Sequence, residues 1–259
     1  MSLREEWRAF LAAAQFLTRA PIVLNAETWA EDVKRSLRYF PAVGGAVGFC
    51  SGAVYALAAL AVPPLAAAAL ALAVEALITG ALHEDGFADY CDAMGAARTP
   101  EQTLAILKDS RIGGFGAVGL TLGLLLRAAC LAALPGAQGL AASAFAGALS
   151  RLSASAALAA AAPVKGASLA ALVGGTASAH AVIASLALAA PFAIAAAWSL
   201  SPAVLLAAPL AALLCAMFVR QMRRRVGGLI GDGLGALIFA AQCGTLLVCA
   251  SVAGVITHP

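Results

Sequence analysis

The residue types best suited to chemistry lie in one short stretch, His83-Glu84-Asp85-Gly86-Phe87-Ala88-Asp89-Tyr90-Cys91-Asp92. Asp85, Asp89 and Asp92 are spaced i, i+4 and i+7, so a helix would carry their carboxylates on one face. Three like charges on one face repel one another, and a divalent cation between them would relieve that repulsion. Carboxylate oxygens favour a hard cation, and Mg²⁺ is the usual ion where the substrate carries phosphates. The spacing therefore predicts a magnesium site, with simple solvation of these acids at a membrane boundary as the alternative.

Two further stretches supply groups that suit phosphate oxygens. In Lys108-Asp109-Ser110-Arg111, the two cations are suited to holding phosphate, and Asp109 is a further candidate metal ligand. Contact with anionic lipid headgroups is the alternative for the cations. The second stretch is a Gly-rich turn that follows three arginines and contains Gly231-Asp232. Such a turn favours closure over a phosphate group, although topology alone also explains the arginines.

Three ionisable residues fall inside apolar runs, where a charge normally faces a partner or a wet cavity. We expect Glu75 to pair with Arg151, with contact between Arg151 and a substrate phosphate as the alternative. Arg127 lies nearer the outer end of its run and is expected to have a structural role. His83 is interpreted either as a base or metal ligand or as a boundary residue that makes hydrogen bonds.

The elements that position these residues follow from an apolar composition. Of 259 residues, 63% are hydrophobic and 11% are charged, and the net charge is only +3. This excludes a soluble enzyme, a disordered chain and a nucleic-acid binder with a strongly basic surface. It predicts an all-α polytopic membrane protein that forms a single membrane-embedded domain over residues 1–259. Seven apolar runs approach the length of a span; they lie near 40–62, 65–82, 113–134, 139–162, 181–199, 202–219 and 234–256.

Basic residues predict the orientation of these spans. With seven spans, fourteen of the sixteen Lys and Arg residues fall on one side of the membrane. The positive-inside rule then places the N-terminus in the cytoplasm and the C-terminus outside. The cytoplasmic segments are 1–39, 83–112 and 220–233. The first of these contains an amphipathic helix that lies in the interface and a second helix that begins at Thr28 with capping-box spacing.

The patterns H-x-D-G-x-x-D-x-x-D, starting at His83, and D-S-R-x-G, starting at Asp109, are specific, and together they resemble the cobalamin synthase family. Its members are adenosylcobinamide-GDP ribazoletransferases, also called cobalamin-5′-phosphate synthases. The resemblance runs nearly end to end. Looser matching segments are Phe16–Pro21, Tyr39–Gly44 and Gly227–Asp232, and Ser150–Arg151 also matches.

The resemblance implies a reaction in which a hydroxyl of α-ribazole, or of its 5′-phosphate, attacks the phosphorus attached to cobinamide and GMP leaves. Adenosylcobinamide-GDP is the other substrate. By this resemblance the site residues have the following roles: Asp85, Asp89, Asp92 and Asp109 bind Mg²⁺, Lys108 and Arg111 hold phosphate, His83 or Asp92 is the base, and Arg151, Gly231 and Asp232 contact the substrate.

The resemblance further implies a multi-pass protein of the bacterial cytoplasmic (inner) membrane. The expected partners are the two substrates and the lipid bilayer, with no nucleic acid. A homo-oligomer or a complex with other cobamide-assembly enzymes is also considered.

Two other functions are compatible with the pattern. A CDP-alcohol-type phosphotransferase acting on a lipid would use a similar spacing of aspartates. An ion-coupled transporter would explain intramembrane charges and Gly-interrupted helices, but the acids cluster on one membrane face rather than at the midplane.

Overall fold

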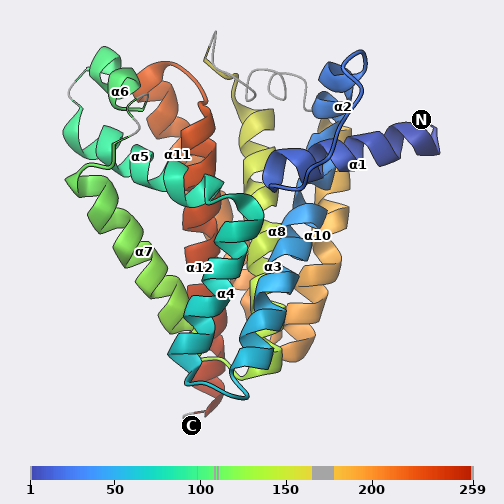
Figure 1. Ribbon diagram of the computed structural model, residues 1–259, viewed down its shortest axis with the longest axis vertical. Helices are drawn as coiled ribbons and strands as arrows, with labels where there is room; N and C mark the ends of the chain where they lie inside the picture. The colour runs from blue at the N-terminus through green and yellow to red at the C-terminus, as the bar shows by residue number, and fades with distance from the viewer. Residues whose placement is uncertain (1, 98, 108, 110, 165–177, 258–259) are drawn as a thin grey trace.

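The computed structural model describes residues 2–97, 99–107, 109, 111–164 and 178–257, and within them the chain is almost entirely helical (Figure 1). Each of the seven predicted apolar runs forms a helix. These helices are α3 (Phe40–Ala58), α4 (Pro64–Thr79), α7 (Gly114–Ala132), α8 (Gly136–Ala160), α10 (Ala179–Ser199), α11 (Ala207–Val226) and α12 (Gly231–Thr257). Pro64 at the start of α4 and the left-handed Gly227 at the end of α11 are typical helix boundaries.

The protein is a polytopic membrane protein, but seven is only an approximate count of its spans. In the described chain, five helical segments are long and apolar enough to cross a membrane, or six if the bent pair of α4 and α5 (Leu82–Ala96) forms one span. Helix α4 alone has only 16 residues. Helix α8 is rich in Ser and Gly and contains Arg151, and it lies in the centre of the bundle, where most of its side chains are buried.

The short helices gather at one end of the bundle, which also carries the N-terminus, whereas the C-terminus lies at the other end (Figure 1). They are α1 (Leu3–Leu17), α2 (Trp29–Ser36), η1 (Leu37–Tyr39), α5 and α6 (Pro100–Ile106); a further short helix, η2 (Pro202–Leu206), precedes α11. The predicted start of α2 is confirmed, but its capping box is wrong. Thr28 has helical φ and ψ, and its hydroxyl donates to Asp32 at 2.8 Å instead of accepting from the helix.

Close contact between α3 and α8 forms the middle of the bundle. A Cβ on Gly44 or Gly48 would overlap the backbone carbonyls of Gly147 and Ser143, so only glycine allows this approach. In a membrane, small residues at a helix crossing are a main source of packing energy. The contact fixes α8, and with it Arg151, at the centre of the protein.

A sharp turn places α5 across the end of the bundle. Gly80 and Ala81 both have left-handed backbone conformations, with φ of 71° and 56°. Because of this turn, α5 runs at 93° to α4 and lies across the end of the bundle (Figure 1). The acidic stretch that starts at His83 forms a helix, α5, as predicted. The first turn of α5 faces the start of α12.

Candidate active site

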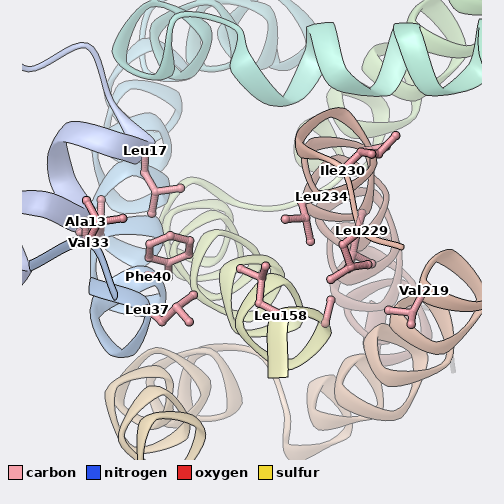
Figure 2. Packing of buried hydrophobic residues seen from close by; sticks show 14 of the residues in the cluster. Ala13, Leu17, Val33, Leu37, Phe40, Leu158, Val219, Leu229, Ile230 and Leu234 are labelled. Atoms are coloured by element: carbon pink, nitrogen blue, oxygen red, sulfur yellow. The ribbon is translucent and has the colours of Figure 1, made fainter. Parts of the chain in front are cut away.

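A cavity of about 380 Å³ opens at the end of the bundle, between α1, α3, α5, α8 and α12. Four of the predicted site residues line it, namely His83, Asp85, Gly231 and Asp232. Its apolar wall includes Leu17, Phe40, Leu158 and Leu234, whose side chains converge from α1, α3, α8 and α12 (Figure 2). The cavity thus joins acidic groups and the start of a long helix to an apolar surface.

The start of α12 gives the cavity an electropositive edge. The first N–H groups of a helix have no partner within the helix, and the helix dipole favours an anion beside them. Gly231 and Asp232 occupy this first turn and line the cavity. Two backbone hydrogen bonds, from Leu229 N–H to the Ala162 carbonyl and from Val164 N–H to the Leu229 carbonyl, tie the preceding turn to the segment that follows α8.

Gly86 explains how α5 approaches α12 so closely. A Cβ at this position would lie 2.9 Å from the carbonyl oxygen of Asp232 and 3.3 Å from Cα of Gly235. The contact brings the acids of α5 next to Asp232. Burial, together with the charges of Asp85, Asp232 and Asp92, raises the pKa of Asp89 to about 6. The carboxylates therefore repel one another across two helices as well as along one.

Asp92 differs from the other acids in its partners. Its two carboxylate oxygens accept hydrogen bonds from the backbone N–H groups of Gly113, at 2.7 Å, and Gly116, at 2.8 Å. Asp92 therefore caps the start of α7, and it lines a separate open groove between α5 and α7. These contacts favour a structural role over the predicted roles of general base and metal ligand, both of which stay predictions.

The predicted phosphate-binding loop is only partly described. Lys108 lies outside the described residues. Arg111 is exposed and forms an ion pair with Asp109 at 2.7 Å. This pair lowers the pKa of the Asp109 carboxyl to about 2. The structure thus joins Asp109 to Arg111 and shows no contact between Asp109 and the acids of α5 within the described chain.

Beneath the cavity lies a network of buried charges. Arg127 donates to Glu75 at 2.6 Å and to Glu84 at 3.2 Å. Glu75 also accepts from Gln242 at 2.6 Å, whereas Arg151 lies 4.0 Å from it. The predicted pair of Glu75 and Arg151 is therefore present as a 4.0 Å contact, whereas Arg127, which the sequence did not assign to Glu75, makes the closer pair at 2.6 Å. The predicted structural role of Arg127 fits its burial.

Arg151 contacts the cavity only through a neighbour. It is fully buried, and its guanidinium lies 3.3 Å from Nδ1 of His83 and 3.2 Å from the hydroxyl of Ser150. Arg151 is not among the residues that line the cavity, and its contact with the substrate stays a prediction. The other ring nitrogen of His83, Nε2, is buried and has no hydrogen-bond partner among the described residues.

The acids suit a metal ion that is shared with a substrate, not one enclosed by protein. The described residues include no group of three or more His, Cys, Asp or Glu side chains placed to hold a metal. Mg²⁺, however, is commonly bound by one or two carboxylates together with substrate phosphates. Asp85, Asp89 and Asp232 repel one another, and a cation bound between them and a substrate phosphate would relieve that repulsion.

Comparison with known proteins identifies the family of the chain. The cobalamin-5-phosphate synthase family matches residues 9–250, a range that includes every residue lining the cavity. The chain belongs to this family. Two proteins named adenosylcobinamide-GDP ribazoletransferase match almost the full chain. The one from Rhizobium etli (strain CIAT 652) is 40% identical over 92% of this chain and 95% of its own length. The one from Leptothrix cholodnii (strain ATCC 51168 / LMG 8142 / SP-6) is 39% identical over 91% and 92%.

A third protein with the same name, from Ralstonia pickettii (strain 12J), is 41% identical over 51% of this chain and 52% of its own length, so this match spans about half of that relative. No solved structure matches the chain.

Sequence reasoning assigned no site role to the residues of α1 that line the cavity. Gln15, Phe16 and Leu17 line it, and Phe16 stacks on Phe40 with ring centroids 5.4 Å apart. The amphipathic pattern of α1 predicts only a helix with one apolar face. Membrane lipid and a protein cavity satisfy such a face equally well, so the pattern did not distinguish them.

Proposed function

We propose that this cavity is the active site of an adenosylcobinamide-GDP ribazoletransferase. A hydroxyl oxygen of α-ribazole, or of its 5′-phosphate, forms a bond to the phosphorus attached to cobinamide. The bond from that phosphorus to the GMP oxygen breaks, and the hydroxyl proton passes to a carboxylate at the cavity. The observation that carries this proposal is the meeting of the α12 N-terminus with the acids of α5, within the range that matches the family.

Phosphate binding is assigned to the start of α12. The unpaired N–H groups of its first turn and the helix dipole favour an anion. Gly231 contributes no side chain there, so a phosphate oxygen can approach the backbone closely. Arg111, on the loop before α7, is a further candidate phosphate ligand, and it would have to exchange Asp109 for the substrate.

Mg²⁺ is assigned to the acids beside this turn. Asp85, Asp89 and Asp232 would hold the ion together with the diphosphate, and it would neutralise charge that develops as GMP leaves. The same three residues, without an ion, would repel an anionic substrate, so their presence next to an anion-binding helix end supports the assignment. Phe16 and Phe40 provide a flat apolar wall that suits the aromatic base of a ribazole.

The cavity end of the protein is assigned to the cytoplasm, with the chain in the bacterial inner membrane. Both the N-terminal helices and the arginines at the end of α11 lie at this end (Figure 1). Basic segments stay on the cytoplasmic side of a membrane. Nothing in the described chain favours a lipid phosphotransferase or a transporter.

The test is GMP release by the purified protein given the two cobamide precursors and Mg²⁺. We expect Asp85→Asn and Asp232→Asn each to lower kcat about 100-fold, the scale of losing one transition-state charge contact. EDTA should abolish activity, and Mg²⁺ should restore it. Glu101→Gln is the matched control, because Glu101 is an exposed acid on α6. Glu84 is unsuitable as a control because it pairs with buried Arg127.

The absence of GMP release by the unaltered protein would refute the proposed reaction. Full activity of both Asn variants with Mg²⁺ dependence intact would refute only the metal assignment.

A further inference from the structure

We infer that His83 serves the reaction as a hydrogen-bond donor through Nε2, not as the general base, and that Arg151 is the positioning residue that fixes this role. The ligand of Nε2 is a phosphoryl oxygen of the nucleotide diphosphate. This inference rests on the proposed function. It assigns one role to His83, which the sequence alone could interpret as a base, a metal ligand or a boundary residue.

The contact between Arg151 and His83 determines which ring nitrogen carries the proton. A guanidinium has only donors, so the atom that faces it must accept. That atom is Nδ1 of His83, which lies 3.3 Å from a terminal nitrogen of Arg151. Nδ1 is therefore unprotonated, and the proton of the neutral imidazole is on Nε2.

The surrounding charges favour the neutral ring. Two arginines and two glutamates form the buried network, and their charges sum to zero. A proton on Nδ1 would place a third cation directly against the Arg151 guanidinium, 3.3 Å away, and the two glutamates of the network are already balanced by the two arginines. Arg151 itself is held in place by the α3–α8 crossing, where its side chain packs over Gly44. Because Arg151 is held in place, it keeps the ring of His83 in the tautomer with the proton on Nε2.

Nε2 is the group that lacks a partner. His83 is only 2% exposed, it lines the cavity, and its Nε2 has no hydrogen-bond partner among the described residues. A buried donor left without an acceptor is unfavourable, because it has lost its hydrogen bonds to water. His83 lines the same cavity as Asp85 and the start of α12, where we propose that the diphosphate binds.

The chemical step leaves the histidine unchanged. As the ribazole oxygen bonds to phosphorus and the GMP oxygen departs, negative charge grows on the non-bridging oxygens. The N–H of His83 donates to one of them, and the proton stays on Nε2 throughout. A donor held ready before the reaction stabilises that charge without reorganising.

Two amide substitutions separate the possible roles of His83. The side-chain amide of Gln reaches the position of Nε2 and can donate there but cannot accept a proton. The side-chain oxygen of Asn reaches the position of Nδ1 and can still accept from Arg151. We expect His83→Gln to retain GMP release within about 10-fold, and His83→Asn to lose about 100-fold or more, as for removal of one donor to a developing oxyanion.

Every other pattern overturns the inference. Loss in both variants, with a thermal unfolding midpoint close to that of the unaltered protein, would identify a base. Activity in His83→Asn but not in His83→Gln would show that His83 matters only as a partner of Arg151. Full activity in both would exclude His83 from the reaction.

A measurement without substrate tests the tautomer directly. In ¹⁵N-histidine-labelled protein, Nε2 of His83 should carry the directly bonded proton and Nδ1 should not. The chain has three histidines, so the signal missing from His83→Gln identifies His83. A proton on Nδ1 would overturn the inference whether or not the protein releases GMP, which keeps this result distinct from failure of the proposed function.

Arg151→Met tests the positioning role. Without the guanidinium, both tautomers become accessible, so Nδ1 should gain a proton signal, and kcat should fall while KM changes little. An unchanged tautomer together with unchanged kcat would remove Arg151 from the proposal.

Discussion

Replacing Arg127 by Met should strongly destabilise the protein, because it removes the central cation of the buried network. The substitution keeps an unbranched apolar side chain of similar length, so it leaves little empty space. It deprives Glu75 and Glu84 of their closest cation, at 2.6 and 3.2 Å. The nearest remaining cation is Arg151, 4.0 Å from Glu75.

The expected loss follows from the burial of these groups. Removing one partner from a buried ion pair costs about 3–5 kcal/mol, because it leaves a charge in a medium that solvates it poorly. For a chain of this size, 1 kcal/mol shifts Tm by about 2–4 °C, so the decrease should be roughly 6–20 °C. The double variant Arg127→Met with Glu75→Gln leaves Glu84 and Arg151, whose charges cancel. The decrease in its free energy of unfolding should therefore be smaller than the sum of the decreases in the two single variants, by about 0.5–3 kcal/mol.

The assay is thermal unfolding of the detergent-purified protein. Arg35→Met is the matched control, because Arg35 also contacts two glutamates, Glu5 at 3.3 Å and Glu31 at 3.1 Å, but at the exposed surface. Exposed pairs contribute little, so its Tm should hardly change. Equal decreases for Arg127→Met and Arg35→Met, or strictly additive losses in the double variant, would refute this reasoning.

Three more expectations concern the fold around the cavity. Asp92→Ala should lower the free energy of unfolding by about 0.5–2 kcal/mol, as for a lost helix cap. At a temperature where the variant is folded, it should keep most of its GMP release. Complete loss of kcat in the folded variant would show that Asp92 takes part in the reaction. Gly86→Val should abolish activity, because its side chain would meet the backbone at Asp232, and an active variant would disprove that contact. A reporter fused at the C-terminus should read extracytoplasmic and one at the N-terminus cytoplasmic; any other pair of readings contradicts the orientation.

The sequence predicted the helices well because the relevant signals are local. Apolar runs of span length, proline at helix starts and the spacing of the acids in α5 each depend on residues near one another in the chain. The exception is the turn before α5. Gly80 is typical of a helix end, but Ala81 gives no sign of its left-handed backbone. Without that sign, the 93° bend between α4 and α5 could not be anticipated.

The partners of buried charges were predicted less well. Depth along a run indicates which residues lie at one level of the membrane, but not which side of each helix faces its neighbours. Glu75 was therefore assigned to Arg151, although Arg127 makes the 2.6 Å contact. Asp92 shares a helical face with Asp85, as its spacing required, yet two backbone N–H groups from a segment more than twenty residues away occupy it. Such contacts depend on tertiary packing and have no pattern in the sequence.

The buried network connects the stability of the bundle with the chemistry of the cavity. Its members come from five helices: Glu75 of α4, His83 and Glu84 of α5, Arg127 of α7, Arg151 of α8 and Gln242 of α12. A hydrophobic set of similar volume would often be as stable or more so, since burying charges is costly. Such a set could not hold Nδ1 of His83 as an acceptor, however, and Nε2 would lose its fixed proton. By the proposed role of His83, the charged residues orient a hydrogen-bond donor beneath the acids before the substrate binds. They lower the free energy of unfolding, but they stabilise the transition state of the reaction.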